Sequence, residues 1–263
     1  MTYLEAIILA IVEGITEFLP VSSTGHIIIA SAALGMKSTP FVKTFTVAIQ
    51  LGAILAVVAL YFERFIKDFK VYPLLIIGVI PAIVFGLLLN DWIDQTLERV
   101  DFVGYGLLAG GIVLMFTDRW FKSVPEEKPV TPAKALIIGL FQCLAILLPG
   151  ISRSAATIIG GLTQRLTRAQ AAEFSFLLAV PTMCAATGYK ILSHFSEGNG
   201  FTEQEVPVLI LGNIVAFIVS WLAIKGFIRF IQNNGLRVFG IYRIIAGLII
   251  LGMYYAGVNM TLM

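Results

Sequence analysis

Charged side chains are scarce in this chain. Of its 263 residues only 13% are Asp, Glu, Lys or Arg, whereas 58% are hydrophobic, and the mean hydropathy is +0.92. A soluble domain averages about 25% charged residues, so this chain has too little polar surface to face water on all sides. The composition predicts an all-α polytopic membrane protein. The net charge of +2 is too small to indicate nucleic-acid binding.

Cysteine and histidine are also rare, with two of each. Cys143 and Cys184 lie in apolar segments without metal-ligand spacing, which favours core packing over a disulfide or a zinc site. His194 stands in a polar segment and is interpreted as an ordinary surface residue. The N-terminus has no basic region and its first apolar run contains glutamates, so no cleavable signal peptide is expected.

The apolar residues form blocks, and those near 20 residues are long enough to cross a bilayer as helices. Blocks 26–35 and 155–162 are too short, and each follows a segment broken by Pro20 or Pro149. Paired half-helices of this kind predict re-entrant hairpins whose irregular backbone is buried in protein or lines a cavity. The chain is therefore expected to form two hairpins and six spanning helices.

The two halves of the chain, 1–128 and 129–263, resemble each other. With a shift of 129 residues, "TYLEAIILAIVEGITEFLPVSSTG" aligns with "TPAKALIIGLFQCLAILLPGISRS", which pairs Ser23 with Ser152. Identity is low and apolar residues match by chance, but the aligned prolines and serines favour a duplication. Each repeat then holds one hairpin and three spanning helices. Three crossings are an odd number, so the second repeat of this single membrane domain is expected to be inverted.

Basic residues predict the orientation. Most of the 18 lysines and arginines fall in loops on one side, whereas Lys37, Lys43, Arg99 and Lys190 fall on the other. The positive-inside rule places the more basic side in the cytoplasm. Both termini and the mouth of the first hairpin are then expected outside.

The segment "EGITEFLPVSSTGH" places ionisable groups between two apolar blocks. Glu13 and Glu17 are four residues apart and share one helix face. A bare charge at mid-bilayer costs about 2.5 kcal/mol or more, so the carboxylates need a cation, protons or water. Mg²⁺ or Ca²⁺ fits paired carboxylates with retained water, and a hydrated helix end is the alternative. His26 fits a proton relay or a nucleophile, although a lone histidine is often a hydrogen-bonded filler.

The residues after Pro20 suggest an anion site. Ser22, Ser23 and Thr24 offer hydroxyls and N–H groups at the start of the next half-helix, and a helix N-terminus binds anions readily. Gly25 would let a ligand approach the backbone closely. The same hydroxyls fit simple helix N-caps equally well.

The second hairpin turns at "PGISRSAAT". Arg153 needs an anionic partner inside an apolar block, and its planar fork suits a phosphate. Ser152, Ser154 and Thr157 surround it with further donors. If the inverted repeats face each other at the midplane, the arginine meets the two glutamates and the histidine of the first motif. A salt bridge that only closes the helix bundle is the structural alternative.

Together these motifs resemble the undecaprenyl pyrophosphate phosphatase family of bacterial membranes, which is associated with bacitracin resistance. The resemblance covers nearly the whole chain. It implies hydrolysis of undecaprenyl pyrophosphate to the monophosphate, which recycles the lipid carrier of peptidoglycan synthesis at the bacterial inner membrane. The family's glutamate motif maps onto Glu13 and Glu17, its Ser-Ser-Thr-Gly-His run onto 22–26, and its Pro-Gly-x-Ser-Arg-Ser motif onto 149–154.

The implied chemistry leaves several alternatives open. A divalent ion on Glu13 and Glu17, together with Arg153, would neutralise the phosphoryl oxygens. His26, Ser23 or water is the nucleophile, and the sequence does not choose among them. The main rival function is a flippase for a polyprenyl phosphate that uses the same midplane site. The glycine-rich "LLAGGI" fits either internal packing or a homodimer among membrane lipids.

Overall fold

The computed structural model describes residues 1–89, 92, 96, 99–121, 128–196, 200–258 and 260, and the regular structure among them is entirely helical. Within these described residues, six helices are long and apolar enough to cross a membrane. The prediction of a multi-pass all-α membrane protein with six spanning helices is therefore confirmed. These helices are α3 (Pro40–Leu60), α5 (Val71–Leu88), α7 (Val100–Trp120), α10 (Arg168–Ser196), α11 (Glu205–Asn234) and α12 (Arg237–Tyr255).

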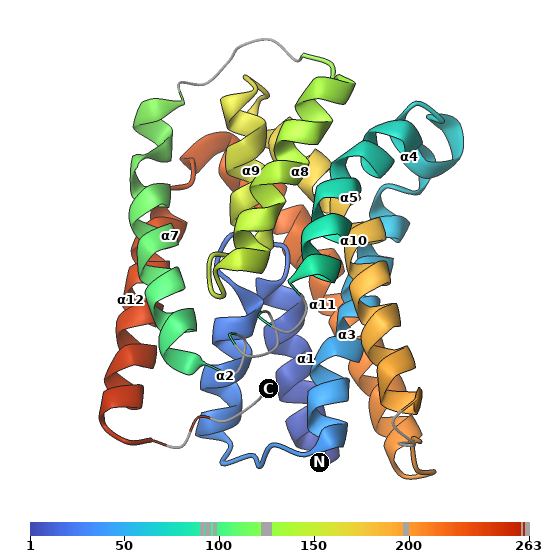
Figure 1. Cartoon of the computed structure of the whole chain (residues 1–263), viewed down its shortest axis with the longest axis vertical. Coiled ribbons are helices and arrows are strands. Elements are labelled where there is room, and N and C mark those ends of the chain that lie inside the picture. Colours follow the sequence, from blue (N-terminus) through green and yellow to red (C-terminus); the bar gives the residue numbers. More distant parts are fainter. Residues whose placement is uncertain are drawn as a thin grey trace.

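Two helical hairpins accompany the spanning helices, as predicted. One precedes α3 and the other lies between α7 and α10. The first consists of α1 (Tyr3–Thr16) and α2 (Ser23–Ala33), and the second of α8 (Pro132–Leu147) and α9 (Arg153–Thr163). The first hairpin enters from the end that holds the N-terminus and the second from the opposite end, so their bends meet near the middle of the molecule (Figure 1). The short helix α4 (Phe62–Lys67) precedes α5 and was not expected.

The first helix of each hairpin begins where the sequence predicts. Thr2 and Glu5 form a capping box at α1, in which each side chain bonds the other residue's backbone N–H. Thr131 caps α8 by accepting a hydrogen bond from the N–H of Lys134, with Pro132 at the first helical position. Both caps satisfy N–H groups that a helix start leaves without partners.

Both hairpin bends contain a serine in the left-handed backbone region. Ser22 and Ser152 each have φ 71°, a conformation that is uncommon for residues other than glycine. The alignment of Ser23 with Ser152 is therefore wrong by one position at the bends. Two residues separate Pro149 from Ser152, whereas only one separates Pro20 from Ser22. A shift derived from the prolines cannot account for that extra residue.

Arg243 of α12 joins the two bends. Its side chain is fully buried. Its Nη1 donates to the carbonyls of Pro20 (3.2 Å) and Ile151 (2.6 Å), and its Nη2 donates to those of Gly150 (2.9 Å) and Gly106 (3.1 Å). One guanidinium thereby satisfies carbonyls from both hairpins and from α7, and a membrane protein must satisfy such groups internally where lipid offers no donors.

The glycine-rich motif of α7 packs inside the fold. A side chain at Gly110 would collide with the guanidinium of Arg243, and a Cβ at Gly111 would lie 2.9 Å from the carbonyl oxygen of Gly240. The motif therefore brings α7 and α12 close together, while the homodimer stays a prediction. Cys143 is buried as expected, but the expectation of core packing is wrong for Cys184, which is exposed on α10.

Replacing Arg243 with methionine should destabilise the fold strongly. The substitution keeps apolar volume but leaves several buried carbonyls without donors, at about 1–3 kcal/mol each. We expect a large fall in the unfolding temperature of the purified protein in detergent. The exposed Arg229 of α11 offers a control, because R229M removes the same charge at the surface. Equal unfolding temperatures for R243M and R229M would contradict this role.

Candidate active site

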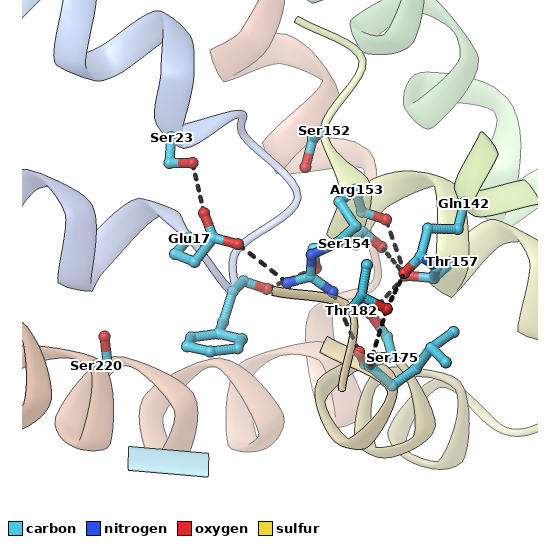
Figure 2. A network of polar contacts seen from close by, with 12 residues as sticks. Glu17, Ser23, Gln142, Ser152, Arg153, Ser154, Thr157, Ser175, Thr182 and Ser220 are labelled. Atoms are coloured by element: carbon cyan, nitrogen blue, oxygen red, sulfur yellow. Dashed lines mark hydrogen bonds and ion pairs between the residues drawn. The ribbon is translucent and has the colours of Figure 1, made fainter. Parts of the chain in front are cut away.

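An ion pair connects the two hairpin bends (Figure 2). Glu17 follows the last residue of α1, and Arg153 is the first residue of α9. The Glu17 Oε1 and Arg153 Nη2 atoms are 3.1 Å apart, and the two side chains are only 7% and 13% exposed. The predicted meeting of an arginine from one hairpin with a glutamate from the other is present in the structure.

Both members of the pair have further polar partners. The hydroxyl of Ser23 donates to Glu17 Oε2 at 2.6 Å, and Arg153 Nη1 donates to the carbonyl of Ser175 on α10 at 3.3 Å. The end of α1 and three further helices, α2, α9 and α10, thus contribute to the contacts that hold the guanidinium and the carboxylate in place (Figure 2). Sequence reasoning missed Ser175, because the contact uses its backbone carbonyl, which every residue type has.

Two polar atoms at this site are buried without a hydrogen-bond partner among the described residues. They are Glu13 Oε1 and Arg153 Nε, and the Glu13 side chain is almost fully buried. Buried polar atoms are paired in most structures, so each unpaired one needs an explanation. A carboxylate oxygen and a guanidinium N–H left free in one place fit a ligand that contains both a cation and an anion.

His26 is held at both ring nitrogens. Its Nδ1 lies 2.7 Å from the carbonyl oxygen of Ser22, and its Nε2 lies 2.7 Å from the hydroxyl of Tyr242 on α12. Because a carbonyl only accepts, Nδ1 carries a proton, and in the neutral ring Nε2 accepts from the tyrosine. Sequence reasoning placed His26 in the site but missed Tyr242.

The hydroxyls of the second motif bind protein groups. Ser154 donates to the carbonyl of Phe18 at 2.7 Å, which ties α9 to the first bend. Thr157 donates to the carbonyl of Arg153 at 2.9 Å and lies 2.6 Å from the hydroxyl of Ser175. Ser152 accepts a hydrogen bond from the N–H of Ala155 and so caps α9. These contacts fix the backbone at the start of α9, which carries Arg153. Substrate binding by these three hydroxyls stays a prediction.

The two caps differ between the hairpins. Ser22 is buried at the N-cap of α2, but its side chain makes no capping hydrogen bond, so the simple-cap alternative is wrong for Ser22. Ser152, for which no cap was predicted, does cap α9. Thr24 lies half-buried in the first turn of α2. A Cβ at Gly25 would lie 2.8 Å from Leu107 Cδ1, so close packing against α7 is one reason for that glycine.

The donor set can be tested against a divalent cation. Glu13 and Glu17 supply carboxylate oxygens, and one of these oxygens is buried and unpartnered. No group of three or more His, Cys, Asp or Glu that could hold a metal occurs within the described part of the chain. Mg²⁺ typically keeps several waters and binds through one or two carboxylates plus substrate phosphates. The residues therefore fit a metal that substrate and water also coordinate.

Comparisons with known proteins identify the family of this chain. A family model described as "Bacitracin resistance protein BacA" matches residues 6–249. A relative from Flavobacterium psychrophilum is 53% identical over 255 residues, which cover 97% of each chain, and one from Flavobacterium johnsoniae is 52% identical over 97% of each. One from Porphyromonas gingivalis is 48% identical and covers 99% of this chain and all of its own. All three are named undecaprenyl-diphosphatase. The chain therefore belongs to the bacitracin resistance protein BacA family.

Proposed function

We propose that this protein is a membrane phosphatase that hydrolyses undecaprenyl pyrophosphate to undecaprenyl phosphate and inorganic phosphate. Relatives named undecaprenyl-diphosphatase match this chain over nearly their whole length. The observation that carries the proposal is the buried pair of Arg153 and Glu17, at the junction of two hairpins, with the arginine Nε free. A phosphoryl group is an anion that a guanidinium can bind in a bidentate manner.

The substrate competes with Glu17 for Arg153. Before the substrate binds, the carboxylate is the counter-ion of the guanidinium. A buried ion pair contributes little net stability, because the cost of removing both charges from water offsets their attraction. A pyrophosphate can therefore replace the carboxylate at the guanidinium, provided that the displaced Glu17 gains another counter-charge. Arg153 then stabilises the charge that develops on the transferred phosphoryl group.

Glu13 and Glu17 are the residues that would hold a Mg²⁺ or Ca²⁺ ion. Such an ion supplies positive charge to the phosphoryl oxygens. Both carboxylates lie on α1 or directly after it, and both side chains are buried. Burial gives carboxylates a strong requirement for a counter-charge, which Arg153 alone provides for only one of them.

Three nucleophiles remain possible in this site. The hydroxyl of Ser23 donates to Glu17, a carboxylate that can accept its proton. His26 has its lone pair at Nε2, where the Tyr242 hydroxyl donates in the structure, and water is the third. In each case the nucleophile bonds to the terminal phosphorus, the P–O bond to the bridging oxygen breaks, and undecaprenyl phosphate leaves with that oxygen. Attack by water releases inorganic phosphate directly, whereas after attack by Ser23 or His26 a water must cleave the bond between the side chain and phosphorus to release it.

We further propose that the protein lies in the inner membrane with both termini outside and that the site opens to the outer side. The uneven distribution of lysine and arginine supports this orientation. An inverted-repeat origin of 1–128 and 129–263 is supported by the packing. Helix α1 of the first repeat packs on α11 of the second, and α8 of the second repeat packs on α5 of the first. The two contacts are therefore equivalent under the repeat. The two hairpins also enter from opposite ends of the molecule (Figure 1).

Removing either member of the ion pair should abolish turnover. We expect Arg153→Ala to lower kcat/KM by roughly a thousandfold, because an arginine that stabilises phosphoryl charge contributes that much. Glu17→Gln should show a loss of similar order. Phosphate release from a polyprenyl pyrophosphate by the purified protein measures both effects.

Arg168→Ala is a matched control, since Arg168 pairs with Asp118 at 2.7 Å outside this site. It should keep its activity as long as its unfolding temperature is unchanged. Near-normal activity of a folded Arg153→Ala protein would contradict the proposed active site. A wild-type protein that binds the lipid but releases no phosphate would favour the flippase.

Chelation should stop the reaction reversibly. We expect EDTA to abolish phosphate release and added Mg²⁺ or Ca²⁺ to restore it. Glu13→Gln should raise the metal concentration for half-maximal activity by roughly tenfold or more, because one of two charged ligands becomes neutral. Full activity in metal-depleted buffer would exclude the metal role of both glutamates.

A further inference from the structure

The hydroxyl of Tyr242 meets His26 at the ring nitrogen that chemistry would use. Since the carbonyl of Ser22 takes the proton of Nδ1, the lone pair of the neutral ring is at Nε2, and the tyrosine hydroxyl lies 2.7 Å from that atom. The two rings are nearly parallel, with 5° between their planes. Both the tautomer and the orientation of the imidazole are thus determined by groups outside the substrate.

Tyr242 is also fixed relative to the bends. It stands next to Arg243, whose guanidinium binds carbonyls of both hairpins. The helix segment that holds the bends together therefore also delivers the hydroxyl to His26. A tyrosine that only filled space between α2 and α12 would need no hydrogen bond to this nitrogen.

We propose that Tyr242 is the positioning residue of His26. Its hydroxyl donates to Nε2 and holds the imidazole in the orientation and tautomer that place the lone pair there. The hydroxyl leaves Nε2 before that lone pair meets the substrate or a proton. This role rests on the proposed phosphatase function. It predicts that loss of the hydroxyl slows the chemical step and makes His26 Nε2 more reactive toward a modifying reagent. Substrate binding should change little.

The test compares Tyr242→Phe with Tyr105→Phe. Tyr105 is a matched control, because it lies on α7, is similarly exposed and donates or accepts one hydrogen bond with Tyr255. We expect Tyr242→Phe to lower kcat by roughly tenfold with KM changed less than about twofold, as the loss of one oriented hydrogen bond to a catalytic group would do. Tyr105→Phe should match the wild type.

A second readout does not depend on turnover. The chain has only two histidines, so in a His194→Gln background His26 is the only imidazole that diethyl pyrocarbonate can modify, and its N-carbethoxy product is followed by its absorbance. Removing the hydroxyl from Nε2 should raise the rate of modification by roughly fivefold, the equivalent of one hydrogen bond. An unchanged modification rate overturns the proposal, whatever the activity. A raised rate in a protein without phosphatase activity would keep the contact and reject the proposed function.

A separate cavity of about 330 Å³ lies at the opposite end of the molecule from the N-terminus. Arg64 contributes to its wall and is paired with Glu173 at 3.0 Å and with Asp68 at 3.4 Å. Lys70 and Lys128 add two more cations to the lining. Three cations against two carboxylates leave one positive charge in excess.

The rest of the lining is apolar and belongs to spanning helices. Leu74 of α5 and Phe174 and Leu177 of α10 form this part. Gln170 fixes the mouth by bonding both the N–H and the carbonyl of Lys128, at 3.3 and 3.1 Å. A basic rim above an apolar wall, between membrane helices at the basic end, is the arrangement that binds anionic lipid headgroups.

We infer that this cavity binds the phosphate headgroup of an anionic phospholipid, a site distinct from the ion pair at the bends. Native mass spectrometry of the protein in detergent with phosphatidylglycerol or phosphatidylcholine tests it. We expect the wild type to retain phosphatidylglycerol preferentially. Lys70→Ala/Lys128→Ala should weaken retention by roughly tenfold or more, at about 1 kcal/mol for each lysine near the surface.

The control Lys67→Ala/Lys225→Ala removes equal charge outside the cavity. Lys67 pairs with Glu63 and Lys225 lies over the ring of Trp221. Equal retention by the two double variants would overturn the site. Displacement of the lipid by excess inorganic phosphate would show that the cavity binds free phosphate, and this result would overturn the assignment to a lipid.

Discussion

Main-chain carbonyls at two helix breaks need donors inside the membrane, and the guanidinium of Arg243 supplies them. A carbonyl without a partner in hydrocarbon costs several kcal/mol, so a broken helix is tolerated only where protein satisfies it. Arg243 bonds Pro20 from the first hairpin and Gly150 and Ile151 from the second. The hairpins therefore stop at a common point, and their bends are fixed relative to each other.

The position of the candidate site follows from this constraint. Glu17 and Arg153 come from different hairpins and can lie 3.1 Å apart only because the bends meet. Ser154, which bonds the carbonyl of Phe18, adds a second tie across the same junction. A phosphoryl group entering here finds a guanidinium whose present partner is a carboxylate. The guanidinium can thus exchange one anion for another without being left unpaired, whereas the displaced Glu17 needs a second counter-charge.

Local patterns were enough to predict the spanning helices, both hairpins and the contact between Arg153 and Glu17. The lengths of the apolar blocks and the positions of Pro20 and Pro149 locate both hairpins, because each is a property of neighbouring residues. The same argument that singled out Arg153, a charge in an apolar block, applies to Arg243. Its partners could not be predicted, since backbone carbonyls carry no residue-type signal and one of them lies 223 residues away. Tyr242 was missed for the same reason of distance.

Divergence between the proposed repeats explains how one junction contains both signs of charge. Glu13 corresponds to Gln142 under the 129-residue shift, and Gln142 is buried next to Thr182, whose hydroxyl donates to it at 3.3 Å. After the left-handed serine of each bend, one half has Ser23 and the other has Arg153. Identical halves would bring like charges together at a twofold axis, at a high cost in a membrane. Keeping the bend conformation while exchanging a carboxylate for an amide and a serine for an arginine leaves a carboxylate and a guanidinium together at one point.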